Sequence, residues 1–261
     1  MMRRLATAAL ALGALLTAGS PVSAERLVAT LSRHQVSVTS NFTGTSIVLF
    51  GTIEPDTPAS RRRTTGYDLV VTVTGPKQTL VARKKERVLG IWTNMDSRTF
   101  VNVPSYLAVL TTQPVEQFTT PDTIKQQQLG LDSILLPQQI GPDLGDPGPS
   151  DVFRRQFVRL KQEHKLFLQT TNGVTMLTPT VFRTDMALPA EASIGNYDVD
   201  VRVFADRQVV ARTSSAFEII KVGFEQFVAN AAREYGFIYG LAAAMMAVVT
   251  GWFASVVFRR D

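Results

Sequence analysis

An uncharged stretch of 24 residues, from Tyr235 to Phe258, constrains the fold of this chain more than any other feature. As an α-helix rising 1.5 Å per residue it would extend about 36 Å, enough to cross the ~30 Å hydrocarbon core of a bilayer with some tilt. Aromatic residues gather at both of its ends, as they do at the two interfaces of membrane helices. A buried helix of a water-soluble protein is a poor alternative, because the stretch has no polar face. We predict a transmembrane helix over 235–258.

Positive charge follows this span directly. Arg259 and Arg260 come next, and Asp261 ends the sequence. Lys and Arg beside a membrane helix favour the cytoplasmic side. We therefore expect residues 259–261 to be a cytoplasmic tail and the bulk of the chain to lie on the far side of the membrane.

The N-terminus predicts the same orientation independently. Arg3 and Arg4 precede an apolar stretch over residues 5–16, and small residues then lead to Ala24. This order is typical of a secretory signal peptide, which would occupy residues 1–24. A retained N-terminal anchor is the alternative, but the apolar stretch is too short to span a bilayer comfortably.

The net charge does not indicate a nucleic-acid partner. The whole chain carries +5, but only +2 remains for the exported part once Arg3, Arg4, Arg259, Arg260 and Asp261 are set aside. Most of the excess of Lys and Arg therefore lies within the predicted signal peptide and beside the predicted span, where it determines the orientation in the membrane. The sequence contains no cysteine, which excludes disulfides, thiolate metal sites and cysteine nucleophiles.

Short apolar and β-branched runs, separated by Gly and Pro, fill most of the exported part. Such spacing is typical of a β-sandwich. The expected strands are 34–39, 46–53, 67–74, 79–83, 87–93, 105–112, 180–188, 197–203 and 209–220. Tyr197, Val199, Val201 and Val203 share one face by period-two alternation, which we expect to point into the core. A tyrosine that starts a late strand is common in immunoglobulin-like sandwiches.

The middle of the chain has a different character and predicts two helices. Thr120 followed by Pro121 is an N-cap signal, and Gly130 is a candidate residue just past the helix end. Asp151 caps a second helix, in which Phe153, Phe157 and Leu160 recur on one face. Basic residues occupy much of the remaining surface of this second helix: Arg154, Arg155, Arg159, Lys161 and Lys165.

We therefore predict a mainly β fold: an immunoglobulin-like β-sandwich over 25–222 with a partly helical insertion at about 113–165, plus one C-terminal transmembrane α-helix. Two small β domains are the alternative. A juxtamembrane helix over 223–234 should join the sandwich to the span, because no flexible linker composition separates them.

Several segments carry a resemblance to a known family. They are LVATLSRHQVSVTSNFTGTSIVLFG, GIWTN followed by VPSYLAV, VFRTDMALPA followed by GNYDVDVRVF, and KVGFEQF with YGLAAAMMAVVTGWFASVVFRR. In this order they resemble a family of transmembrane proteins from alphaproteobacteria that has no established biochemical function. The resemblance implies a bacterial inner membrane and a periplasmic domain. It also implies, through neighbouring genes, an association with permeases similar to sulfite exporters, and it brings no catalytic residues.

The sequence contains few candidate reactive groups. His34 and His164 are the only histidines, and neither has a second ligand at metal-binding spacing. Asp198 and Asp200 share one strand face, which predicts a solvated surface more readily than a cation site. No phosphate-binding, dinucleotide-binding or nucleophile motif occurs. We therefore expect no cofactor, no metal and no enzymatic activity.

Two basic groups and one tryptophan remain to be interpreted. Arg61, Arg62 and Arg63 lie in a predicted loop, and Arg83, Lys84, Lys85 and Arg87 lie near a predicted strand end. Both groups are solvated turns or, alternatively, contacts for an anion or a lipid headgroup, since guanidinium groups match oxyanions well. Trp92 is expected in the core.

The span itself contains a ridge of small residues. Gly236, Gly240 and Ala244 recur at intervals of four, and a second series continues along the helix: Ala243, Ala247, Gly251 and Ser255. Residues four apart share one helix face, and small residues let helix backbones approach closely in lipid. The alternative is that membrane helices are rich in Gly and Ala in any case.

The function that these patterns favour is a non-enzymatic, membrane-anchored periplasmic accessory or interaction protein. Its partners would be the lipid bilayer and a permease of the anion or sulfite-exporter type, or a second copy of the chain through the transmembrane helix. A periplasmic ligand-binding or sensing module for a small anion is the alternative. An enzyme whose site has no recognisable motif is a third.

Overall fold

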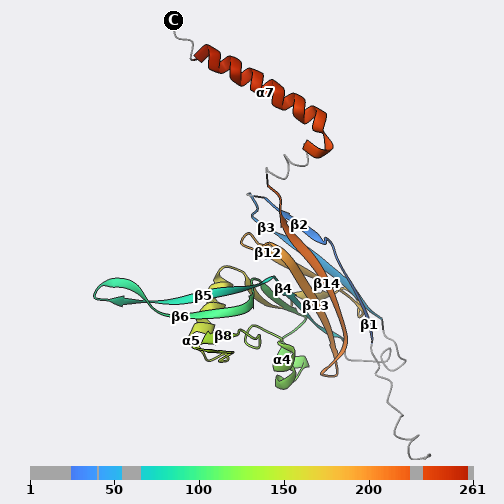
Figure 1. Cartoon of the computed structure of the whole chain (residues 1–261). Coiled ribbons are helices and arrows are strands. Elements are labelled where there is room, and N and C mark those ends of the chain that lie inside the picture. The colour runs from blue at the N-terminus through green and yellow to red at the C-terminus, as the bar shows by residue number, and fades with distance from the viewer. Residues whose placement is uncertain (1–24, 40, 55–65, 224–231, 258–261) are drawn as a thin grey trace, which may run out of the picture.

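The structure is a computed structural model, and it describes residues 25–39, 41–54, 66–223 and 232–257 (Figure 1). It is mainly β, with one long apolar helix at the C-terminal end. The predicted fold class is thereby confirmed. The predicted signal peptide and cytoplasmic tail lie outside the described residues.

Two sheets pack face to face to form the sandwich. Strands from the first and last thirds of the chain pair directly, β3 (Gly44–Glu54) with β12 (Val181–Pro189) and β4 (Asp68–Thr74) with β13 (Gly195–Ala205), so both thirds belong to one sandwich. The first sheet has the order β1 (Arg26–Leu31), β3 (Gly44–Glu54), β12 (Val181–Pro189) and β11 (Val174–Met176). The second has the order β10 (Phe167–Thr171), β7 (Leu107–Thr111), β4 (Asp68–Thr74), β13 (Gly195–Ala205), β14 (Gln208–Lys221) and β2 (Gln35–Val38).

The connectivity is immunoglobulin-like. In chain order, β1, β3, β4, β11, β12, β13 and β14 take the places of strands A to G, so the first sheet is A-B-E-D and the centre of the second is C-F-G. The Tyr197 hydroxyl donates a 2.7 Å hydrogen bond to the Ser193 carbonyl, four residues upstream. This is the tyrosine corner of such sandwiches. β1, β10 and β11 were not predicted from the sequence.

The core between the sheets follows the period-two alternation of the strands. Tyr197, Val199, Val201 and Val203 are fully buried, as predicted. They lie in one apolar cluster with residues of the opposite sheet, which include Ile47, Leu49, Phe182 and Met186. The register of β13 is therefore confirmed.

A second apolar core lies on the outer face of the second sheet, so its β4 and β7 strands are buried on both sides. Val70, Leu107 and Val109 point into this core. The insertion between β7 and β10 covers them with α3 (Val115–Phe118), α4 (Pro121–Gln127), β8 (Gln138–Ile140), β9 (Asp143–Gly145) and α5 (Val152–Glu163). The predicted helical insertion thus provides the cover for one sheet face.

The helix starts in the insertion were predicted correctly, but one helix end was not. The Thr120 hydroxyl accepts from the Thr123 amide, and the Asp151 carboxylate accepts from the Arg154 amide at 2.7 Å. The α4 helix ends at Gln127 and not just before Gly130. Gln128 itself adopts the left-handed conformation, with φ of 53°, that glycine was expected to supply.

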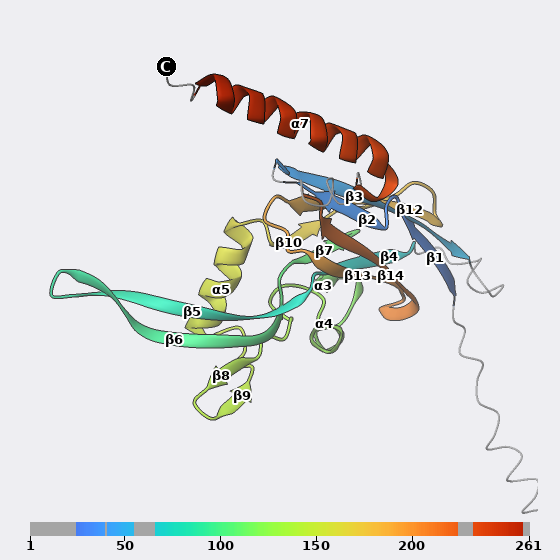
Figure 2. The ribbon, with the colours of Figure 1, turned by 45° about the horizontal axis from the view of Figure 1, so that its top comes forward.

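A long β-hairpin leaves the fold between β4 and β7. Its arms are β5 (Lys77–Val88) and β6 (Ile91–Pro104). β5 contains the predicted strand 79–83, but the predicted strand 87–93 is wrong, because the turn at Leu89 and Gly90 divides it between the two arms. β6 also pairs with β8, and the outer part of the hairpin projects away from the sandwich (Figure 2). Trp92 lies near its end with 67% of its surface exposed, so its predicted core position is wrong.

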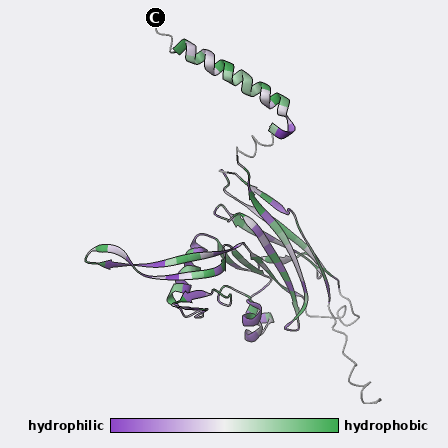
Figure 3. Cartoon of the chain, viewed as in Figure 1, coloured by the Kyte–Doolittle hydropathy of each residue, from purple (hydrophilic) through white to green (hydrophobic). Residues whose placement is uncertain are grey.

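The C-terminal helix α7 (Gly236–Val257) matches the predicted span within one residue at each end (Figure 3). It is long and apolar enough to cross a membrane, and none of it is buried against the described parts of the chain. Residues 232–234 are helical and the chain bends at Tyr235. Residues 224–231 of the predicted juxtamembrane helix lie outside the described residues.

Replacing Val201 with aspartate would place a charge without a partner in the main core. We expect Val201→Asp to lower the free energy of unfolding by on the order of 4 kcal/mol. The control is Asp198→Asn, because Asp198 is exposed on the opposite face of β13. Urea unfolding in detergent solution measures both; equal losses would contradict this register.

Candidate functional site

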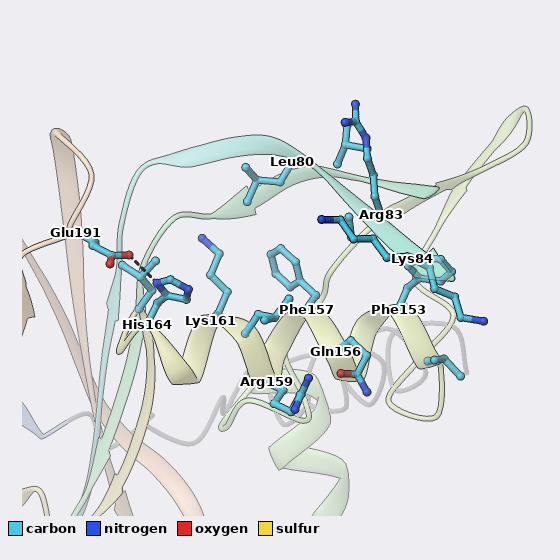
Figure 4. A pocket seen from close by; sticks show the side chains of 16 residues that line it. Leu80, Arg83, Lys84, Phe153, Gln156, Phe157, Arg159, Lys161, His164 and Glu191 are labelled. Carbon is cyan, nitrogen blue, oxygen red and sulfur yellow. Dashed lines mark hydrogen bonds and ion pairs between the residues drawn. The ribbon is translucent and has the colours of Figure 1, made fainter. Parts of the chain in front are cut away.

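A groove of about 830 Å³ separates β5 from α5 and is the candidate functional site (Figure 4). Its apolar floor includes Leu80 and Ala82 from β5 and Phe153 and Phe157 from α5. Leu80 and Ala82 recur at period two on the strand face that packs on the second core. Phe157 stacks on Phe100 of β6 with ring centroids 4.3 Å apart, which fixes α5 against the hairpin.

The rim of the groove is strongly basic. Five Lys and Arg side chains line it against one carboxylate, that of Glu191: Arg83, Lys84, Lys85, Arg159 and Lys161. The Glu191 carboxylate lies 2.8 Å from the His164 ring at the end of α5. It therefore has a partner of its own at the mouth of the groove. An apolar floor with a cationic rim suits an anion better than a cation.

Lys161 is the most unusual cation of this set. It is half-buried, and its ammonium group donates to the Ser105 carbonyl at 3.2 Å. The ammonium also lies 5.7 Å from the Phe157 ring centroid and 5.9 Å from that of Phe167. Burial lowers the pKa of Lys161 below its ordinary 10.5, and the charge of Glu191 opposes this only in part.

Lys161 has unused hydrogen-bonding capacity. Among the described residues, no carboxylate lies within ion-pair distance of its ammonium group. A lysine ammonium has three donors, and one carbonyl accepts from it here. Figure 4 shows Lys161 rising from α5 toward β5 beside Phe157. An oxyanion in the groove would give this desolvated cation the partner it lacks.

Arg154 was predicted on the solvated surface of α5, and this prediction is wrong. Its side chain is 3% exposed, and its guanidinium bonds both carboxylate oxygens of Asp146, at 2.8 and 3.1 Å. It also donates to the carbonyls of Ile134 and Asp132, at 2.6 and 3.1 Å. These bonds orient α5 below the groove. Leu160, predicted on the buried face, is 48% exposed at the groove.

The predicted small-residue ridge lies along α7. A Cβ built at Gly236, Gly240 or Gly251 would meet nothing within 4 Å outside the helix itself. Ala243, Ala244, Ala247 and Ser255 are likewise exposed. Neither the groove nor the sandwich contacts this surface in the described parts of the chain.

Two other predictions concerned the arginines of one loop and the Asp198–Asp200 carboxylate pair. The loop with Arg61, Arg62 and Arg63 lies outside the described residues. Asp200 is not part of a solvated carboxylate pair, since it forms ion pairs with Arg202 at 2.5 Å and Arg212 at 2.7 Å.

Both histidines have structural partners. The His34 ring lies 3.3 Å from the Ala216 carbonyl, and His164 pairs with Glu191. No group of three or more His, Asp or Glu side chains that could hold a metal ion occurs among the described residues.

Comparison with known proteins identifies the chain at family level. The family described as "Putative transmembrane protein (Alph_Pro_TM)" matches residues 26–260. This match confirms the resemblance found in the sequence. No curated protein matches the chain.

A solved structure, the N-terminal domain of the Streptococcus gordonii adhesin Sgo0707, is 9% identical and has a TM-score of 0.28. The match covers 75% of this chain and 32% of that one. This chain therefore spans about a third of the length of the structure that it matches.

Replacing Lys161 should change how stability depends on pH. Because its pKa is lowered in the folded state, the unfolded chain binds more protons between that value and 10.5, and unfolding becomes less favourable as pH rises through this window. Lys161→Met should lack this component. Urea unfolding at pH 8 and pH 10.5 tests it: the stability of the parent relative to the variant should increase at the higher pH, and a constant difference would contradict the assignment.

Proposed function

We propose that this chain, which belongs to the Alph_Pro_TM family of alphaproteobacterial transmembrane proteins, is a non-enzymatic interaction protein that α7 both anchors in a membrane and offers to a partner helix. One observation carries the proposal. All 22 residues of α7 are left uncovered by the described remainder of the chain, although the helix presents a surface with the composition of a helix–helix contact.

The composition of α7 differs around its circumference. Successive residues are about 100° apart, so Gly236, Gly240, Ala247 and Gly251 fall on one side. Bulky side chains such as Val249 lie about 180° from Gly240. A surface of glycines and small side chains lets a second backbone approach closely, and close packing is what associates helices in lipid, where no hydrophobic force acts between them.

The proposal includes an orientation and a class of partner. The sandwich lies in the periplasm of a bacterial inner-membrane protein, and residues 259–261 lie in the cytoplasm. The signal-like N-terminus and the charges of Arg259 and Arg260 support this orientation. The partner is a permease of the anion or sulfite-exporter type, or a second copy of the chain. The absence of a catalytic role is part of the proposal.

Bulky substitutions on the ridge test the proposal directly. Gly240→Leu and Gly251→Leu keep the span apolar, so insertion should survive, but the added side chains hold neighbouring backbones apart. We expect both variants to lose crosslinks to a partner protein or to a second copy in native membranes. Val249→Leu, on the opposite side of α7, is the matched control and should retain them.

Insertion must be checked separately for these variants. Alkaline phosphatase fused after Gly223 should stay equally active in all of them if orientation is unchanged. Retention of every crosslink of the parent by both glycine variants would show that α7 is only an anchor.

A second candidate function, a binding module for a small anion, is supported by Lys161. Its half-buried ammonium group faces a groove with four further Lys and Arg side chains, and no carboxylate of the described residues lies within ion-pair distance of it. An oxyanion there would gain charge-assisted hydrogen bonds from a desolvated donor. In this role the groove would sense or deliver the anion beside the permease.

Thermal unfolding in the presence of sulfite, sulfate or an alkyl sulfonate tests the anion module. A ligand that binds only the folded state stabilises it by about 2.7 kcal/mol at one hundred times its dissociation constant. We expect the parent to be stabilised and Lys161→Met to lose most of the effect. Lys125→Met is the control, because Lys125 is exposed on α4 and does not line the groove. Equal stabilisation of all three would place the anion elsewhere.

A further inference from the structure

The turn of the β5–β6 hairpin contains a residue that its conformation disfavours. Leu89 and Gly90 connect the arms, with φ of 48° and 85°. Both central residues of such a two-residue turn need positive φ, for which Asn-Gly or Asp-Gly is preferred and a bulky side chain is unfavourable. The side chain of Leu89 is also 99% exposed. Neither the backbone nor solvation accounts for a leucine here.

Apolar side chains cover both faces of the hairpin around this turn. Val88 is paired with Ile91 and Arg87 with Trp92, so Ile91 and Trp92 point to opposite faces. Ile91 is 73% exposed and Trp92 67%. Together with Leu89 at the end, Val88, Ile91 and Trp92 form an apolar cap of four residues.

Basic side chains lie directly behind the apolar cap. Arg83, Lys84, Lys85 and Arg87 precede the turn, with Glu86 as the one acidic residue between 83 and 92, which leaves a net charge of +3. The Arg87 side chain donates to the Gly90 carbonyl at 3.2 Å and thereby ties a cation to the turn. All four basic residues are exposed.

The outer hairpin also lacks structural support. The third strand, β8, pairs with β6 only at Thr99 and Phe100. Beyond that point the two arms pair with each other and with no further strand among the described residues. A two-stranded ribbon is at best marginally stable in water. Binding to a surface would stabilise it.

We propose that the apolar cap inserts into the interface of an anionic lipid bilayer, with the basic residues behind it contacting lipid headgroups. Trp and aliphatic side chains favour the boundary between headgroups and acyl chains. Lys and Arg beside them are attracted to anionic lipids, each changing the docked-to-free ratio about fivefold. A protein partner would need an acidic rim around an apolar pocket. An anionic bilayer already combines negative charge at its surface with an apolar interior, so no pocket is needed.

The connection between β14 and α7 is short enough for the hairpin to reach the bilayer. The bilayer that α7 crosses is held within reach, because the 14 residues between Lys221 and Gly236 extend at most roughly 50 Å. The 12 residues of β5 make an arm of roughly 40 Å. Docking is then an intramolecular event at high effective concentration, so a small apolar cap suffices. This contact is independent of the partner proposed for α7.

Trp92 reports on the contact. The chain has two tryptophans, and Trp252→Phe in α7 leaves Trp92 alone. The full chain with this change is reconstituted in nanodiscs of phosphatidylcholine, with or without phosphatidylglycerol, and with bromine-labelled acyl chains. We expect the Trp92 emission to shift to the blue and to be quenched by bromine, more strongly when phosphatidylglycerol is present.

Two further variants separate the roles of the cap and the charges. Leu89→Asn suits the turn better and removes the apolar end, so it should abolish the shift and the quenching while the hairpin stays intact. The pair Arg83→Gln and Lys85→Gln should reduce the docked-to-free ratio about 25-fold in phosphatidylglycerol and little in phosphatidylcholine.

Unquenched Trp92 with water-exposed emission in every lipid would overturn the proposal. So would a Trp92 that is exposed in nanodiscs and becomes protected only in native membranes, since that result assigns the cap to a protein partner.

Discussion

One buried guanidinium, that of Arg154, holds the insertion in shape. The segment from 132 to 148 contains no helix or long strand that could order it. Arg154 connects it to α5 by binding Asp146 and the carbonyls of Asp132 and Ile134, while Asp146 accepts from the amides of Leu136 and Gly148. Removing one partner of such a buried pair leaves an uncompensated charge, which costs roughly 3–5 kcal/mol. The orientation of α5, and with it one wall of the groove, depends on these bonds.

The sandwich gives the insertion its base. Because β4 and β7 are buried on both faces, the second sheet belongs to two cores at once: Val71 and Ala108 pack inward, Val70 and Val109 outward. The hairpin leaves between these two strands, and the insertion leaves after the second of them. The hairpin and the insertion are therefore both built toward the same edge of one sheet. The strand that leads toward α7, β14, lies nearer the other edge of that sheet.

Local patterns predicted the parts of this fold that depend on local forces. The alternation in β13 identified Val199 and Val201 as core residues because period two is a property of the strand itself, and the Asp151 cap depends on residues within one helical turn. Arg154 and Trp92 were misplaced because their burial depends on distant partners. A Trp in a β-rich run is ordinarily core, and Trp92 is exposed because no third strand of the described residues lies beside it. The groove could not be predicted, since its walls come from segments some 70 residues apart.

The residues that stabilise the fold are not the residues that expose apolar surface, and this difference bears on function. The side chains of the two cores stabilise the β-rich part of the chain, whereas the side chains of α7 and of the hairpin end lie outside both cores. Apolar surface exposed to water is a liability for solubility and aggregation, and a sequence under no other demand would replace Leu89 with a residue that also suits its backbone better. The membrane removes this liability for α7. The same environment lies within reach of the hairpin and would remove this liability there too, so one bilayer accounts for the apolar exposure of both α7 and the hairpin end.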